Sequence, residues 1–129
     1  MKYQNEIVEQ LKELAVNVNY FPGIGWWHFR YESYQMVYIP ANDISDTIRI
    51  CIPHFDDANQ YESESLAAAI NETNREVKYV KVVQLGNGSI SINYDHKYDG
   101  ENDLYSLILH ILKTLCFTAE YLKNKLSKE

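Results

Sequence analysis

The Asn87-Gly88 dipeptide constrains the fold of this chain more than any other feature of its sequence. It lies between residues 77–85 and residues 89–94, two runs rich in valine, isoleucine and tyrosine. A two-residue type I′ turn requires positive φ at both central positions, and asparagine and glycine adopt that conformation most readily. The pattern therefore predicts a tight antiparallel hairpin with Asn87 and Gly88 at its tip.

This turn also predicts the pairing of the two strands, with Lys81 opposite Tyr94. A slip of one residue would move every side chain to the other face of the hairpin, and this register gathers mostly apolar side chains on one face. Lys81 is the exception, which a bulge or a snorkelling side chain at a sheet edge would resolve. The same register places Val80 and Val82 on the outer face of the hairpin.

The rest of the chain shows the hydrophobic periodicities of helices and strands. The second helix is predicted to begin at Asn59, because Glu62 follows three residues later as in a capping box. The predicted helices cover residues 2–18, 59–75 and 104–126, and the predicted strands cover residues 25–31, 34–39, 47–52, 77–85 and 89–94. The order α-βββ-α-ββ-α predicts a single α+β domain over residues 1–129, with helices packed against an antiparallel sheet.

Charge and cysteine content restrict the compartment and the partners. The net charge is −6 and the basic residues are scattered rather than clustered, so no nucleic-acid partner is expected. The N-terminus lacks the basic-then-apolar pattern of a signal peptide, and no apolar run approaches the ~20 residues of a membrane span. Cys51 and Cys116 are expected to be free thiols in a reducing cytosol. We therefore expect a cytoplasmic protein without a membrane partner.

Residues 54–57, His-Phe-Asp-Asp, form the densest cluster of possible metal ligands. Carboxylates and an imidazole suit a divalent cation, but acidic side chains directly before a helix also stabilise its N-terminus. The four histidines show no motif spacing with cysteine or acidic residues, and no nucleophile elbow accompanies the serines. The sequence therefore predicts a non-enzymatic protein without a metal or another cofactor.

The aromatic content is the feature that indicates recognition, with eleven tyrosines and two tryptophans in 129 residues. Adjacent strand residues point to opposite faces, so Trp26 and Trp27 cannot both face the core. With Trp27 directed inward, a set of apolar residues remains on the outer face of the sheet. We predict that this set binds protein: Trp26, Met36, Tyr38, Val80 and Val82. The alternative is that the N-terminal helix covers this face.

The order of elements and several motifs resemble the bacterial YbjN family. The resemblance is carried by Ile70-Asn71-Glu72-Thr73-Asn74 at the end of the middle helix, by residues 77–85, by the Gly86-Asn87-Gly88 turn, by residues 89–94 and by the long leucine-rich last helix. It implies the type III secretion chaperone-like fold, in a compact and often dimeric domain related in shape to chaperones that hold partner proteins. It implies no catalytic residue, because the motifs of the family are mainly structural.

These observations predict a cytoplasmic, chaperone-like interaction module. It would bind a partner protein segment, or itself as a homodimer, through the apolar sheet face. The alternative is a small-ligand-binding protein or enzyme, with a pocket between sheet and helices that is lined by tyrosines and one or two histidines. A roadblock- or profilin-like scaffold is a further α+β arrangement of similar elements, and it would also be an interaction module.

Overall fold

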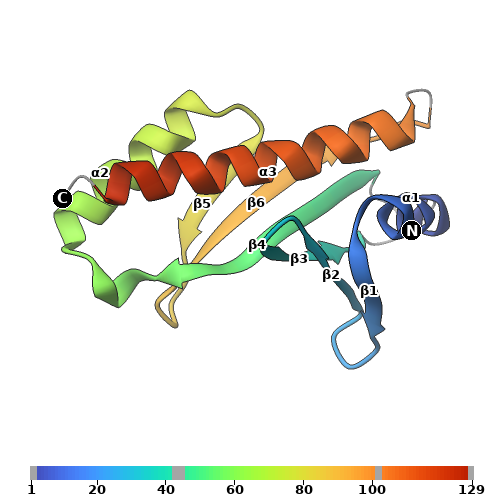
Figure 1. Cartoon of the computed structure of the whole chain (residues 1–129), viewed down its shortest axis with the longest axis horizontal. Helices are drawn as coiled ribbons and strands as arrows, with labels where there is room; N and C mark the ends of the chain where they lie inside the picture. The colour runs from blue at the N-terminus through green and yellow to red at the C-terminus, as the bar shows by residue number, and fades with distance from the viewer. Residues whose placement is uncertain (1–2, 42–45, 101–102, 128–129) are drawn as a thin grey trace.

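The computed structural model describes residues 3–41, 46–100 and 103–127, and in these ranges the chain forms a six-stranded antiparallel sheet and three α-helices. The elements are α1 (Gln4–Leu14), β1 (Val16–Phe21), β2 (Trp26–Tyr31), β3 (Tyr34–Ile39), β4 (Thr47–Asp57), the 3-10 helix η1 (Ala58–Gln60), α2 (Ser63–Glu76), β5 (Val80–Gln84), β6 (Ser89–Lys97) and α3 (Leu104–Leu126). The strand order across the sheet is β1-β2-β3-β4-β6-β5 (Figure 1). The predicted α+β class is therefore confirmed.

The helices α1, α2 and α3 contribute to a single hydrophobic core on one side of the sheet. Leu11 of α1, Leu66 of α2 and Leu115 of α3 belong to the same buried cluster as Phe29 and Ile50 of the sheet. Helix α3 runs along the length of this core, with α1 near one end and α2 near the other (Figure 1). We call the side of the sheet that meets this core the inner face and the opposite side the outer face.

The N-terminal segment differs from the prediction of a helix over residues 2–18. Helix α1 ends at Leu14, and Ala15 is already extended, with φ −125° and ψ 175°. The next six residues form β1, whose valines and asparagines alternate with the period of a strand. Asn17 has φ 57° at a register shift against β2, a conformation that asparagine tolerates better than most residues. The helical spacing of apolar residues therefore continued by chance into a strand.

The hairpin is present, but its predicted turn and register are wrong by one residue. The loop contains three residues, Gly86 to Gly88, and the Leu85 amide donates to the Ser89 carbonyl across its base at 2.8 Å. Gly88 alone in this loop has positive φ, at 89°, as in a three-residue hairpin loop that ends in a glycine bulge. The pairing consequently shifts, so that Val80, not Lys81, lies opposite Tyr94.

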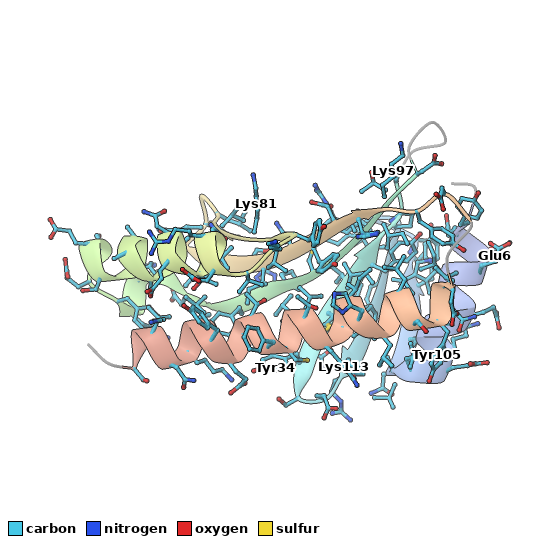
Figure 2. All side chains as sticks on the ribbon, turned by 90° about the horizontal axis from the view of Figure 1, so that it is seen from above. Glu6, Tyr34, Lys81, Lys97, Tyr105 and Lys113 are labelled. Atoms are coloured by element: carbon cyan, nitrogen blue, oxygen red, sulfur yellow. The ribbon has the colours of Figure 1, made fainter. Side chains whose placement is uncertain are left out.

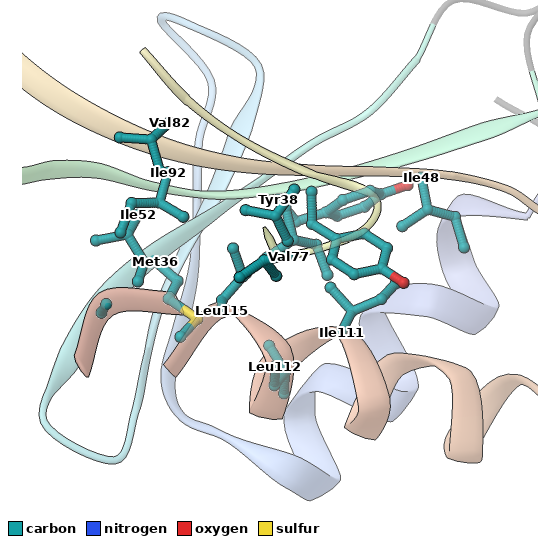
Figure 3. Close-up of a cluster of buried hydrophobic side chains, with 14 of the residues drawn as sticks. Met36, Tyr38, Ile48, Ile52, Val77, Val82, Ile92, Ile111, Leu112 and Leu115 are labelled. Carbon is teal, nitrogen blue, oxygen red and sulfur yellow. The ribbon is translucent and has the colours of Figure 1, made fainter. Parts of the chain in front are cut away.

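This shift reverses the two faces of β5. Lys81 is exposed on the outer face, which removes the need for a bulge or a snorkelling side chain. Val80 and Val82 are instead 3% and 1% exposed and belong to the core, so their predicted outward placement is wrong. Figure 3 shows Val82 beside Ile92, its partner on β6, within the buried cluster.

Strand β3 is reversed in the same way. Met36 and Tyr38 are 1% and 0% exposed and lie in the core, which contradicts their predicted placement on the outer face. Figure 3 shows Met36 and Tyr38 within the buried cluster. Tyr38 pairs with the buried Ile50 of β4, whereas Val37 pairs with Cys51 on the outer face. Residues 36–39 are all apolar, so alternation within this strand alone does not distinguish its two faces.

The segment between β4 and α2 also differs from its predicted boundaries. Strand β4 continues past Pro53 to Asp57, with a register shift between Ile52 and Asp56. Helix α2 begins at Ser63 rather than at Asn59, and the Glu62 carboxylate accepts a hydrogen bond from the Glu64 amide as its cap. The Asp57 carboxylate caps η1 by accepting from the amide of Asn59.

An asparagine of α2 forms hydrogen bonds with the free edge of β5, the last strand of the sheet. The Val82 amide donates to Asn74 Oδ1 at 2.6 Å, and Asn74 Nδ2 donates to the Val82 carbonyl at 3.0 Å. The side chain thereby takes the place of a neighbouring strand at this position. Open strand edges invite pairing with other chains, so Asn74 both joins α2 to the sheet and blunts this edge.

Candidate functional site

The outer face of the sheet has an apolar centre. Val37 and Cys51 lie opposite each other on the two middle strands and are buried by their neighbours. Beside them are half-buried side chains from β2 and β3, namely Trp26, His28 and Ile39. On the other side, Ser91 and Asn93 of β6 separate them from the half-buried Val83 of β5. The exposed ring of Phe21 extends this centre to the β1 edge, where its centroid lies 4.2 Å from that of the His28 ring.

Polar and charged residues surround the apolar centre. Arg49 and Asp95 face each other on β4 and β6, and two hydrogen bonds of 2.6 and 3.1 Å join their side chains. Arg30, Lys81 and Lys97 are exposed on β2, β5 and β6. In Figure 2, Lys81 and Lys97 project on the side of the sheet away from α3, whereas Lys113 projects from α3 on the other side.

Of the five predicted binding residues, the structure leaves only Trp26 on the outer face. The other four lie in the core, and their strand neighbours take their places: Val37 and Ile39 on β3, Lys81 and Val83 on β5. The alternative in which the N-terminal helix covers this face is also wrong, because Ile7, Val8 and Leu11 of α1 join the inner core. A three-residue loop at Gly86-Asn87-Gly88 would have assigned β5 correctly and turned Lys81 to solvent.

Neither cysteine has the lowered pKa of a reactive thiol. Burial raises the pKa of the Cys51 thiol to about 12 and that of the Cys116 thiol to about 11. A cysteine acts as a nucleophile in its thiolate form, and surroundings that lower the pKa of the thiol favour that form. Both residues are therefore protonated at neutral pH, and both are free thiols, as the sequence predicts.

Residues 54–57 are engaged in local hydrogen bonds. His54 Nδ1 lies 3.1 Å from Ser89 Oγ, and the Tyr61 hydroxyl donates to the Asp56 carboxylate. Asp57 caps η1. Within residues 3–41, 46–100 and 103–127, no three histidine, cysteine or acidic side chains form a group that could hold a metal ion.

A cavity of about 340 Å³ lies between the start of β3, the second half of β4 and the C-terminal part of α3. Its lining includes Tyr34, His54, Phe55 and Lys123. The Lys123 ammonium donates to the Tyr34 hydroxyl at 3.1 Å and lies 4.9 Å from the centre of the tyrosine ring. These groups line the cavity with aromatic rings and hydrogen-bonding atoms.

The charges beside this cavity neutralise each other. The Tyr34 hydroxyl donates to the Glu120 carboxylate, and the Lys123 ammonium lies 3.5 Å from the same carboxylate. The hydrogen bond from Tyr34 lowers the pKa of Glu120, while burial is the main cause of the raised pKa of Tyr34. Glu120 and Lys123 are thus ionised and paired at neutral pH, and Tyr34 is a neutral hydrogen-bond donor.

Comparisons with known proteins relate this chain to a fold. No known protein family matches its sequence, and no curated protein matches it. Among solved structures, it is similar to the crystal structure of an uncharacterised protein from Methanothermobacter thermautotrophicus, with a TM-score of 0.66 and 11% sequence identity. The match covers 97% of this chain and 96% of that chain. At this identity the similarity concerns the fold alone.

Length and apolar character determine whether a helix can span a membrane. A span needs about 20 predominantly apolar residues. Among the helices of the described ranges, none has both the length and the apolar character to cross a membrane.

Proposed function

We propose that the protein is a cytoplasmic, non-enzymatic interaction module whose outer sheet face binds a protein partner. One observation carries this proposal: the described helices α1, α2 and α3 all pack on the inner side, so none of them covers the half-buried Trp26 and Ile39 beside the apolar centre at Val37 and Cys51. Antiparallel sheets with one solvated face normally alternate apolar residues inward and polar residues outward. The centre of this outer face departs from that pattern.

The layout of the face supports binding rather than catalysis. Protein interfaces combine an apolar, aromatic-rich core with a polar rim, and this face has Trp26 and Phe21 near an apolar centre with arginines and lysines around it. Large aromatic residues often contribute most of the binding energy of an interface. Trp26 is therefore the anchor that we propose, with Ile39 of the adjoining strand β3 as its apolar neighbour and Val83 as a second apolar contact on β5.

The resemblance to the YbjN family indicates what kind of partner the proposed module binds. Proteins of that fold are compact and often dimeric, and they are related in shape to chaperones that hold partner proteins. The proposed module accordingly holds a segment of another protein, or a second copy of itself. Similarity of fold by itself is a weak argument for function, so the proposal depends on the composition of the face.

The test compares two aromatic substitutions on opposite sides of the molecule. Trp26→Ala removes the proposed anchor, and Phe117→Ala removes an exposed aromatic side chain of α3. Tagged wild type and both variants are used to capture proteins from the native cytosol, and light scattering gives the mass of each purified protein. We expect one stoichiometric partner, or a dimer, that is kept by Phe117→Ala and lost by Trp26→Ala.

Two results would contradict the proposal. One is equal capture and equal mass for all three proteins, because the outer face would then have no role in association. The other is a large loss of stability in isolated Trp26→Ala, measured by urea unfolding, which would assign Trp26 to the fold. An unchanged urea midpoint in both variants makes the capture result interpretable.

The cavity beside Tyr34, His54 and Lys123 favours a second function, the binding of a small polar ligand. Its volume of about 340 Å³ falls within the usual range for ligand pockets. A thermal-shift screen of polar metabolites tests this function, because a ligand at 100 times its Kd stabilises the fold by about 2.7 kcal/mol. The effect should disappear in Tyr34→Phe. A screen without such a ligand counts against this second function.

A further inference from the structure

The outer face differs in charge from the rest of the chain. Four basic residues point to this face, Arg30, Arg49, Lys81 and Lys97, together with the two acidic residues Asp57 and Asp95. Its formal charge is therefore +2, whereas the whole chain carries −6. The remainder of the molecule then carries −8. An acidic protein thus presents a basic sheet face.

Most of this positive charge has no ion-pair partner in the described part of the chain. Arg49 is paired with Asp95. Among the described residues, none forms an ion pair with Arg30, Lys81 or Lys97. All three side chains are exposed. They are consequently available to carboxylates of another molecule, and each new pair would add to the apolar contacts at the centre.

The positions of the cations indicate the length of a matching segment. Arg30 lies on β2 and Lys81 lies on β5, four strand spacings away. Four spacings of ~4.8 Å span about 19 Å, which is the length of about six extended residues. The apolar centre at Val37 and Cys51 lies between these two cations. A matching segment therefore has carboxylates near both ends and apolar residues in the middle.

The same charges disfavour a second copy on this face. A symmetric dimer with the two outer faces in contact would place each set of cations against its own image, and like charges across an interface cost binding energy. Nucleic acid is also a poor match, because proteins that bind it present clustered lysines and arginines to its phosphate backbone. Here the cations lie around an apolar centre, and one of them is neutralised by Asp95.

We propose that the outer face binds an extended acidic protein segment with apolar or aromatic residues between its carboxylates. This proposal depends on the proposed function, since it specifies the partner of the same face. Arg30 and Lys81 hold the two ends of the segment. Trp26 and Val83, on the same two strands, contact the residues next to those ends, and Ile39 of β3 contacts its middle.

Selection from a phage-displayed library of random dodecapeptides tests this proposal. The full-length protein is immobilised and panned against the library, and an enriched peptide is then synthesised with a fluorescein label for anisotropy. We expect enriched sequences with net negative charge and central apolar residues. Binding should weaken more than tenfold in Arg30→Glu/Lys81→Glu and several-fold between 50 and 300 mM salt, because surface charges are screened. It should not change in Lys113→Glu, which alters an exposed lysine of α3.

Each other outcome overturns a defined part of the argument. Enriched peptides that are apolar but uncharged, and that require Trp26, keep the proposed function and refute the acidic partner. The absence of any enriched peptide that requires Trp26 refutes both. Tighter binding of a labelled single-stranded oligonucleotide, lost in Arg30→Glu/Lys81→Glu, replaces the protein segment with nucleic acid. A dimer lost in Trp26→Ala assigns the face to self-association.

The charge-reversal variant Arg30→Glu/Lys81→Glu must keep the unfolding midpoint of the wild type. If it lowers that midpoint, Arg30→Gln/Lys81→Gln is the milder substitute.

Discussion

The side-chain amide of Asn74 binds both the amide and the carbonyl of Val82, so an α2 residue completes the hydrogen bonding of an edge strand. An asparagine side chain has one acceptor and two donors, which suits it to imitate a paired strand at a single residue. The relationship connects α2, the only α-helix between β4 and β5 in the described chain, to the sheet edge. It also leads to a direct test.

Asn74→Leu should destabilise the fold by about 1–3 kcal/mol, because the amide and carbonyl of Val82 lose their partners in a partly buried site. Urea unfolding measures this loss. Asn71→Leu is the matched control, since Asn71 is exposed on the same helix and no described residue bonds its side chain. Light scattering should also show more aggregation in Asn74→Leu, because the edge is opened. Equal stability of the two variants would show that the two bonds contribute little.

The three-residue hairpin loop predicts different effects for two nearby glycines. Gly88 has φ +89°, and an added Cβ would lie 3.1 Å from Asn59 Nδ2. Gly86 has no atom within 4 Å of an added Cβ. Gly88→Ala should therefore cost about 1 kcal/mol or more, and Gly86→Ala should cost almost nothing. Thermal unfolding separates the two, and equal costs would contradict the loop described above.

The register of β5 predicts opposite tolerance at two consecutive valines. Val82→Lys would bury a charge in the core and should prevent stable folding, because an unpaired buried charge costs several kcal/mol. Val83→Lys places the charge on the outer face and should change stability by less than about 1 kcal/mol. Circular dichroism and urea unfolding provide the readout. The reverse pattern would restore the two-residue turn and its register.

Alkaline pH should weaken the fold partly through Cys51. Burial raises its pKa to about 12 from an ordinary value of 9.0, so the thiol stays protonated in the folded state while the unfolded chain ionises. Stability from this group is complete below pH 9 and decreases as the pH rises from 9 towards 12. By pH 10 the loss is about 1 kcal/mol. Cys51→Ala should lose less stability than wild type between pH 8 and pH 10, and an identical pH profile would contradict this expectation.

The exposed pair of Arg49 and Asp95 should affect binding more than folding. Both side chains are more than 40% exposed, and such surface pairs contribute about 0–1 kcal/mol. Asp95→Asn should therefore leave the urea midpoint nearly unchanged, while it releases Arg49 and raises the positive charge of the outer face. The selected acidic peptide should then bind several-fold more tightly. Weaker binding in Asp95→Asn would argue against charge as the basis of recognition.

The periodic spacing of apolar residues made most of the elements predictable. Turn length and strand pairing determined which face each strand presents to the core. The α+β class, the strands of residues 25–31 and 34–39 and the long last helix follow from apolar spacing. Strand β1 was missed because Leu14 and Val18 continue a helical interval although Ala15 is extended. That error changed one element and left the class intact.

The errors at the candidate site have a different origin. Both Asn87-Gly88 as a two-residue turn and Gly86-Asn87-Gly88 as a three-residue loop agree with the sequence, and they differ by one residue in register. Since strand side chains alternate, one residue exchanges the two faces. In β3, the apolar run Met36–Ile39 gives no alternation that would separate inside from outside. Pairing with β4 makes that choice, and such pairing is not visible in one strand alone.

The basic sheet face and the acidic remainder together give the molecule an electric dipole. Such a dipole would act before contact, because it would turn the proposed acidic partner towards the sheet over distances of about one Debye length, ~8 Å at physiological salt. Encounters would then occur more often in the productive orientation than random collision allows. The arrangement of charges would mainly raise the rate at which complexes form. The apolar centre would mainly lengthen the lifetime of those complexes.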